Sequence, residues 1–174
     1  MIVDRPESHF IFVVPMDHVE YRYNYITLRG EPLTNKQYLE HWGKWLVFGL
    51  REEVEALAKK LDPYVEEKKV PAVKYDRELI TEFQLNRCVM CVYCHDETRD
   101  EVWEILAALN VKDKAWMYER ETLEKWLPGG VNLEKWIQGR GLDQEQAERV
   151  RADAHAKFKK MFADENEIFT GVYQ

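Results

Sequence analysis

Three cysteines and a histidine at regular spacing are the residues of this sequence whose types most directly suggest chemistry. Residues 86–96, NRCVMCVYCHD, contain Cys88, Cys91 and Cys94, and His95 follows the third thiol. Thiolates at such spacing bind iron–sulfur clusters, or zinc when a histidine joins them. One hypothesis is therefore a metal or redox protein that holds an iron–sulfur cluster or zinc with these four residues.

The residues between the cysteines favour a buried strand instead. They are valine, methionine and tyrosine, which fit a pleated sheet, and cysteine is itself a common buried residue. In a strand Cys88 and Cys94 share one face and Cys91 takes the other, with roughly 10 Å of rise between successive cysteines. Such side chains do not converge on one ion. We therefore expect a structural strand without a cofactor, and keep the metal site as the alternative.

Two lysines are candidates for binding an anion. Lys44 opens the apolar run GKWLVF, and Lys74 lies near the end of VPAVKY. Both runs are predicted strands, so one sheet would bring the two amines toward the same edge. We assign Lys44 and Lys74 as candidate ligand-binding residues.

Aromatic residues are abundant, with 6 Trp, 9 Tyr and 7 Phe. Tyr21, Tyr23 and Tyr25 alternate within YRYNYITL and would share one face of a strand. That stripe either packs under helices or forms one wall of a ligand cleft. Trp42, just before the GKWLVF strand, joins these tyrosines as a candidate ligand-binding residue.

Two further tryptophans belong to a short repeat. LEKWL at residues 123–127 is echoed by LEKWI at residues 133–137, with Pro-Gly-Gly between them. We interpret the repeat as two short helical turns that each present a tryptophan. Trp126 and Trp136 are therefore candidate interface residues, because large aromatics are enriched where proteins associate.

The charge balance excludes several classes of protein. The chain carries 25 basic and 32 acidic residues, a formal charge of −7, which argues against general binding of nucleic acid or anionic membranes. No apolar run reaches the length of a membrane span, and no signal peptide is recognisable at the N-terminus. With an odd number of cysteines, the sequence predicts a cytoplasmic protein with reduced thiols.

Hydrophobic periodicity predicts one α+β domain over residues 1–174. Thr98 and Glu101 suggest a capping box at the start of one helix. The predicted strands are residues 9–16, 21–28, 43–48, 70–75, 87–95, 115–119 and 168–173, and the predicted helices are residues 34–41, 51–64, 98–109 and 143–163. We expect a curved, mostly antiparallel sheet with helices on one face and a helical C-terminal insertion at residues 123–165. A ferredoxin-like arrangement of the two strand–helix–strand units, 43–75 and 87–119, is the alternative.

Four short motifs carry a resemblance to a known family: GKWLVF, VPAVKY, CVYCHD and the closing GVY. They resemble a domain family of uncharacterised function that has the fold of the mRNA cap-binding translation initiation factor. The resemblance covers residues 43–118 and the C-terminus, and implies a curved sheet with one concave face. The family's Lys-Thr-Asp is replaced by residues 119–121, Glu-Arg-Glu, and no cap-stacking tryptophan pair is matched, so cap binding does not follow. The matching positions are Gly43, Lys44, Trp45, Lys74, Val92, Tyr93, Asp96, Gly171 and Tyr173.

No metalloprotease, nucleophile-elbow, P-loop or dinucleotide-binding motif occurs, so we expect a binding protein rather than an enzyme. The first hypothesis is an accessory subunit of a larger cytoplasmic complex, which docks on a protein partner or a second copy through a Trp- and Tyr-rich surface. A metal or redox protein is one alternative. The other is a protein that binds a nucleotide-like or anionic ligand on the concave sheet face.

Overall fold

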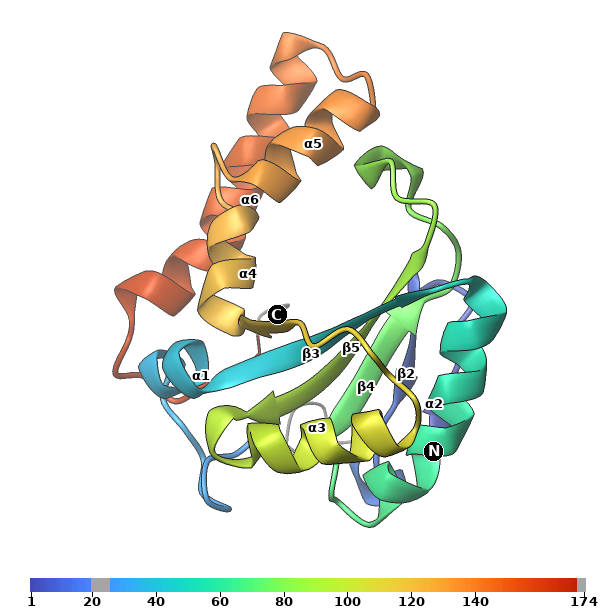
Figure 1. The fold of residues 1–174 in the computed structure, drawn as a ribbon. Coiled ribbons are helices and arrows are strands. Elements are labelled where there is room, and N and C mark those ends of the chain that lie inside the picture. Colours follow the sequence, from blue (N-terminus) through green and yellow to red (C-terminus); the bar gives the residue numbers. More distant parts are fainter. Residues whose placement is uncertain (20–25, 172–174) are drawn as a thin grey trace.

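The computed structural model describes residues 1–19 and 26–171. Within this part six strands form one sheet in the order β1-β2-β4-β5-β3-β6, and every neighbouring pair is antiparallel (Figure 1). The strands are β1 (Ile2–Val3), β2 (Phe10–Val13), β3 (Trp42–Gly49), β4 (Ala72–Asp76), β5 (Cys88–His95) and β6 (Trp116–Tyr118). The predicted α+β fold with an antiparallel sheet is confirmed.

The described part of the chain also contains six α-helices. They are α1 (Asn35–His41), α2 (Arg51–Glu66), α3 (Arg99–Ala108), α4 (Glu119–Lys125), α5 (Val131–Gly139) and α6 (Gln144–Ala163). Short 3-10 turns occur as η1 (Met16–His18), η2 (Thr81–Phe83) and η3 (Asp96–Thr98). No helix among the described residues has both the length and the apolar character that crossing a bilayer requires.

The two strand–helix–strand units interlock at the centre of the sheet. In the first unit α2 joins β3 to β4, and in the second α3 joins β5 to β6. Strand β5 pairs between β3 and β4, and β6 pairs on the far side of β3. These four strands and two helices thus have the split βαβ order of ferredoxin-like folds, and β1 and β2 extend the sheet beyond β4.

Helices α2 and α3 cover one face of the sheet. Val54, Ala58 and Leu61 recur at helical spacing on α2 and are at most 1% exposed. They share one core cluster with Val102 of α3 and with Met90 of β5. Alternation along the strands therefore sends one set of side chains into this core and leaves the other set on the opposite face.

Thr98 does not cap α3 in the predicted way. Its hydroxyl donates a hydrogen bond of 3.3 Å to the carbonyl of His95, and its side chain accepts no bond from the helix. The turn η3 comes between the strand and the helix, so the side chain closes that turn instead of the first helical turn. The capping-box prediction for residues 98–101 is wrong.

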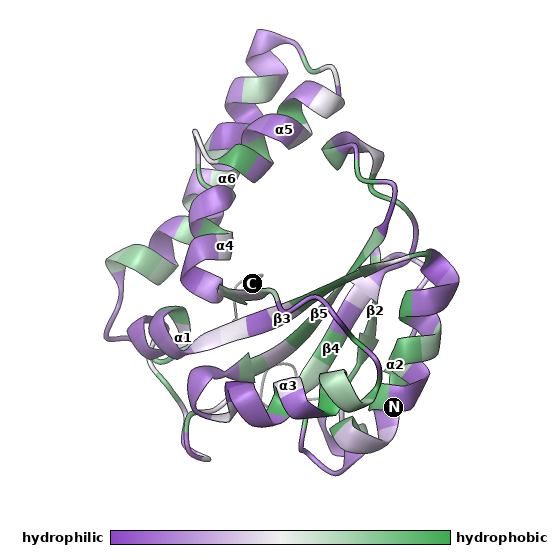
Figure 2. Cartoon of the chain, in the orientation of Figure 1, coloured by the Kyte–Doolittle hydropathy of each residue, from purple (hydrophilic) through white to green (hydrophobic). Residues whose placement is uncertain are grey.

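The C-terminal helices α4, α5 and α6 form an arm that extends from the sheet beside β6 (Figure 1). Figure 2 shows the arm as mostly hydrophilic, whereas hydrophobic residues concentrate in the sheet and in the facing sides of its helices. Asp143 caps α6 by accepting a 2.8 Å bond from Gln146 N, at the start of the helix that the sequence predicted over residues 143–163. The sequence predicted a strand over residues 168–173. In the described part of that range, Ile168 forms an isolated antiparallel bridge with Thr34.

The tip of the arm contacts the loop between β4 and β5. The Phe83 ring meets the Trp126 ring edge to face at 5.7 Å, and Arg140 Nη1 lies 3.4 Å from Glu82 Oε1. Gly139 allows this approach, because a side chain there would come within 2.9 Å of the Glu82 backbone. The arm and the loop are therefore in contact beyond the edge of the sheet.

Candidate functional site

The face of the sheet opposite α2 and α3 carries two lysines. Lys44 on β3 lies directly across from Tyr93 on β5, and Lys74 on β4 lies across from Cys91. We call the face formed by these four residues the lysine face. The Lys44 and Lys74 amines lie 5.4 and 5.9 Å from the centroid of the same Tyr93 ring. The sheet thus brings together the two lysines that the sequence placed on separate strands.

Lys44 is buried and forms an ion pair with Glu119, the first residue of α4. The Lys44 Nζ to Glu119 Oε1 distance is 2.7 Å, and each side chain is only 6% exposed. Tyr38 of α1 donates a hydrogen bond of 3.0 Å to the other carboxylate oxygen, Oε2. Burying two charges is costly unless they are paired and hydrogen-bonded, and this pair meets both conditions.

Glu119 and Tyr38 were not predicted as site residues. Glu119 is far from Lys44 in sequence, and only the pairing of β6 with β3 brings the two together. The one signal was the position of Glu119 at the end of a short predicted strand, where a charged residue is usually solvated.

The Lys74 amine has different neighbours from the Lys44 amine. Its Nζ lies 4.2 Å from the centroid of the Phe10 ring, and no carboxylate of the described residues lies within ion-pair distance of it. Burial lowers the pKa of Lys74, and the positive charge of Lys44 acts in the same direction. Electrostatic attraction by Cys91, Glu119 and Asp76 opposes this effect without cancelling it.

Asp76 lies on the same strand and the same face as Lys74, but it is not a strong counter-charge. It is 4% exposed, and its Oδ2 accepts a 2.7 Å hydrogen bond from Val89 N. Burial raises the pKa of Asp76, so the neutral acid is favoured relative to an exposed aspartate. Glu119 is already bonded to Lys44, so among the described residues neither of these two carboxylates forms an ion pair with Lys74.

The sheet separates the three cysteines. Cys88 and Cys94 are fully buried in the core beneath α2 and α3, whereas Cys91 lies on the lysine face. Burial raises the pKa of Cys94 to about 12, which keeps its thiol neutral. Within the described residues no three His, Cys, Asp or Glu side chains are placed to hold a metal ion.

His95 ends β5 and packs against Trp42, with the ring centroids 6.1 Å apart. Its Nδ1 is buried without a hydrogen-bond partner in the described part of the chain. His95 therefore does not join the thiols around a common point.

Trp42, a candidate ligand-binding residue, lies inside a second core cluster formed by α1, α4 and α6. It is 1% exposed, and its Nε1 donates a 2.9 Å hydrogen bond to the carbonyl of Thr27. Trp42 is therefore a core residue that packs beside the lysine face. Tyr21, Tyr23 and Tyr25 lie outside the described residues.

The two candidate interface tryptophans are both partly buried. Trp126 packs between the cluster around Trp42 and the cluster that α5 forms with α6. The Trp136 ring lies beneath Arg140, whose guanidinium carbon is 4.8 Å from the ring centroid. The exposed large apolar side chains of the described residues are aliphatic residues, methionines and Phe48, with no tryptophan among them.

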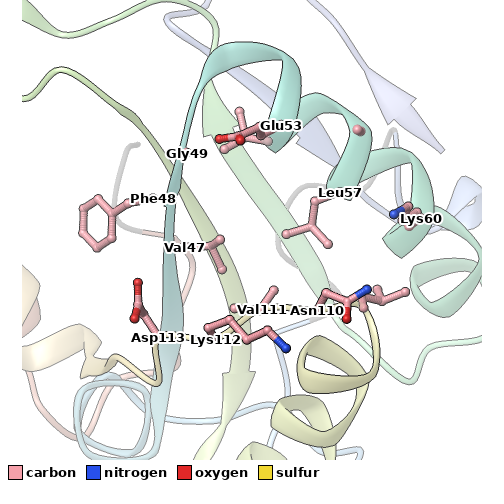
Figure 3. A pocket seen from close by; sticks show the side chains of 13 residues that line it. Val47, Phe48, Gly49, Glu53, Leu57, Lys60, Asn110, Val111, Lys112 and Asp113 are labelled. Atoms are coloured by element: carbon pink, nitrogen blue, oxygen red, sulfur yellow. The ribbon is translucent and has the colours of Figure 1, made fainter.

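A groove of about 510 Å³ opens at the end of β3, between α2 and the segment after α3 (Figure 3). Val47, Leu57 and Val111 form its apolar floor, and Lys60 and Lys112 lie at its margin. It lies on the side of the sheet that α2 and α3 cover, so it is separate from the lysine face. Its two acidic residues, Glu53 and Asp113, offset the charges of the two lysines.

The chain matches no protein-family model, no curated protein and no solved structure. The resemblance to the family with the cap-binding fold therefore stays a prediction. Of the candidate residues, the two lysines are the ones that the sheet assembles with further ionisable groups, in a cluster that also contains Tyr93, Glu119 and Tyr38.

Proposed function

We propose that this protein binds a small anionic ligand on the lysine face, with Lys44 and Lys74 as the cationic groups. The observation that carries the proposal is the contrast between the two amines. Lys44 has a carboxylate at 2.7 Å, whereas Lys74 has aromatic rings and a second cation as its neighbours. A carboxylate or phosphate beside Lys74 would supply the missing counter-charge.

The surrounding side chains support a ligand that is small and partly planar. The Tyr93 ring lies next to both amines, and Phe10 adds an apolar surface beside Lys74. Such pairing of cations with aromatic faces suits an anion attached to a short carbon skeleton or to a base. Nucleotide-like anions and small carboxylic acids both belong to this class.

Buried charges of this kind are also unusual as purely structural features. Replacing a buried ion pair by apolar residues is often neutral or stabilising, so a fold has little reason to keep two lysines within one sheet. Clusters of ionisable groups with shifted pKa values occur preferentially at functional sites. A binding role accounts for both lysines with one explanation.

The role of an accessory subunit in a cytoplasmic complex stays a second candidate. Its support is the aromatic content of the chain and the partial exposure of Trp126 and Trp136. The anion-binding role has the more specific geometry behind it, because it assigns a task to each charged group of the cluster.

A thermal-shift screen with phosphate, pyrophosphate, AMP, pyruvate and succinate tests the proposal. We expect at least one anion to raise the Tm of the wild-type protein in a concentration-dependent way. The Lys74→Met variant should lose most of that shift. Lys69→Met is the matched control, because Lys69 is an exposed lysine whose partner is Glu67, and it should retain the shift. An anion that stabilises Lys74→Met as strongly as the wild type would contradict the proposal.

A further inference from the structure

The surroundings of Lys74 suit covalent chemistry as well as anion binding. An amine becomes nucleophilic when an apolar site and a neighbouring cation disfavour its protonated form. Lys74 has both conditions: the Phe10 and Tyr93 rings flank its Nζ at 4.2 and 5.9 Å, and Lys44 lies by the same Tyr93 ring at 5.4 Å. The Lys44 charge is held in place by Glu119.

We infer that Lys74 forms an imine with the carbonyl group of a small oxo acid bound on the lysine face. This inference rests on the proposed function and narrows its ligand class to anions that carry an aldehyde or ketone. The Lys44 ammonium keeps its ion pair with Glu119, and a further N–H of the same ammonium binds the carboxylate of the oxo acid, so that the carbonyl carbon can reach Lys74 Nζ. The two lysines therefore have different tasks, one as a charge and one as a nucleophile.

The step balances without any further reagent. The lone pair of the neutral Lys74 amine attacks the carbonyl carbon, and one amine proton passes to the carbonyl oxygen to give a carbinolamine. The carbon–oxygen bond then breaks, the oxygen leaves as water with the second amine proton, and the carbon–nitrogen double bond forms. Oxidation states do not change, so neither an oxidant nor a reductant is needed, and hydrolysis reverses the step.

Burial distinguishes this amine from the exposed lysines of the chain. Burial lowers the pKa of Lys74, and each unit of decrease raises the neutral fraction at pH 7 about tenfold. The groups that act on it are Lys44, Cys91, Glu119 and Asp76, of which only Lys44 disfavours the charged amine. Exposed lysines such as Lys59 and Lys69 are ion-paired with glutamates, which favours their charged form.

Reductive trapping tests the inference. The intact protein is incubated at pH 7 with pyruvate and sodium cyanoborohydride, which reduces an imine to a stable secondary amine, and the modified lysine is located by peptide mass spectrometry. We expect the adduct at Lys74 to form at least about tenfold faster than at exposed lysines. Mapping on the wild type does not depend on any variant being folded.

Two controls separate this inference from the proposed function. Lactate has the carboxylate of pyruvate but no carbonyl, so it should raise the Tm and compete with trapping without forming an adduct. Lys74→Arg removes the amine nucleophile, so it should give no adduct at residue 74. If lactate stabilises the protein but cyanoborohydride modifies only exposed lysines, the imine is wrong and anion binding stands. If neither acid shifts the Tm and Lys74 stays unmodified, both fail.

Discussion

The amine of Lys44 and the carboxylate of Glu119 lie 2.7 Å apart, and each side chain is 6% exposed. One residue lies on β3 and the other begins α4, so the ion pair joins the sheet to the C-terminal arm. Tyr38 of α1 completes the contact through its hydrogen bond to Glu119. The pair therefore holds three elements around one end of the lysine face.

Removing one partner of this ion pair should destabilise the protein strongly. Lys44→Met leaves the Glu119 carboxylate buried with its charge uncompensated, and we expect the free energy of unfolding to fall by about 3–5 kcal/mol. The double variant Lys44→Met/Glu119→Met removes both charges and should recover most of that loss. Urea denaturation measures the stability of the single and the double variant. Lys69→Met removes one partner of the exposed Lys69–Glu67 ion pair, so it is the control and should leave the midpoint nearly unchanged. A double variant as unstable as the single one would show that packing, not charge, dominates.

The approach of β6 to β3 depends on Gly43. A side chain at Gly43 would lie 2.7 Å from the carbonyl oxygen of Met117 and would clash with the Trp116 ring. Gly43→Ala should therefore push β6 away, displace Glu119 from Lys44, and lower the free energy of unfolding by about 1–3 kcal/mol. Gly49→Ala at the other end of β3 is the matched control, because its nearest neighbour is the flexible Glu53 side chain at 3.1 Å. Equal urea midpoints for the two variants would contradict this view of the strand pair.

Much of the fold follows from local patterns. Helices α2 and α6 could be predicted from the sequence, because apolar spacing and an aspartate at a helix start each depend on residues a few positions apart. The placement of Cys88 and Cys94 on one face of β5 and of Cys91 on the other could be predicted for the same reason. Thr98 shows where this fails, because a 3-10 turn before the helix leaves its hydroxyl bonded to His95.

Only part of the site could be predicted from the sequence. Lys44 and Lys74 were recognisable as charges in apolar strands, but Glu119 and Tyr38 join them only through strand order and helix docking. Trp42 was taken as a ligand-binding candidate, and the structure buries it because α1, α4 and α6 close over that end of the sheet. Long-range contacts of this kind depend on topology, which no local pattern contains.

Replacing Lys74 should make the unliganded protein more stable. A partly buried cation without a counter-ion costs folding free energy at neutral pH, because the unfolded chain solvates that charge freely. We expect Lys74→Met to raise the free energy of unfolding at pH 7, because the variant removes the cost of burying that amine. The lowered pKa means that the unfolded state binds more protons, so wild-type stability rises with pH until about pH 10.4, where the advantage of the variant disappears. Denaturation at pH 7 and pH 10 checks the sign, and a less stable variant at pH 7 would contradict it.

The arm should be sensitive to acid through Glu134. This α5 carboxylate accepts bonds of 3.0 and 2.7 Å from Nε and Nη2 of Arg151 on α6, and the hydrogen bond from Arg151 lowers the pKa of Glu134 to about 2. Its contribution is therefore present above about pH 4.5 and is lost as the pH falls toward 2. Tryptophan fluorescence during acid titration should show the arm loosening in that interval.

Two variants isolate this effect. Glu134→Gln should remove the acid-dependent step, because the amide does not titrate. Glu148→Gln removes the more exposed contact of the same Arg151 and should leave the step in place. An unchanged acid profile in Glu134→Gln would assign the loosening to other carboxylates.

The central claim is that Lys74 is an amine without a counter-ion among residues 1–19 and 26–171, and that an external anion can neutralise it. Lysine side-chain NMR measures this directly, by titrating the Lys74 resonance with pH in the absence and presence of phosphate. Lys74→Arg identifies the resonance by its disappearance. We predict a Lys74 pKa below the ordinary value of about 10.4 without phosphate, and an upward shift when phosphate binds, because a nearby anion favours the charged amine. An ordinary Lys74 pKa that phosphate does not change would contradict the account.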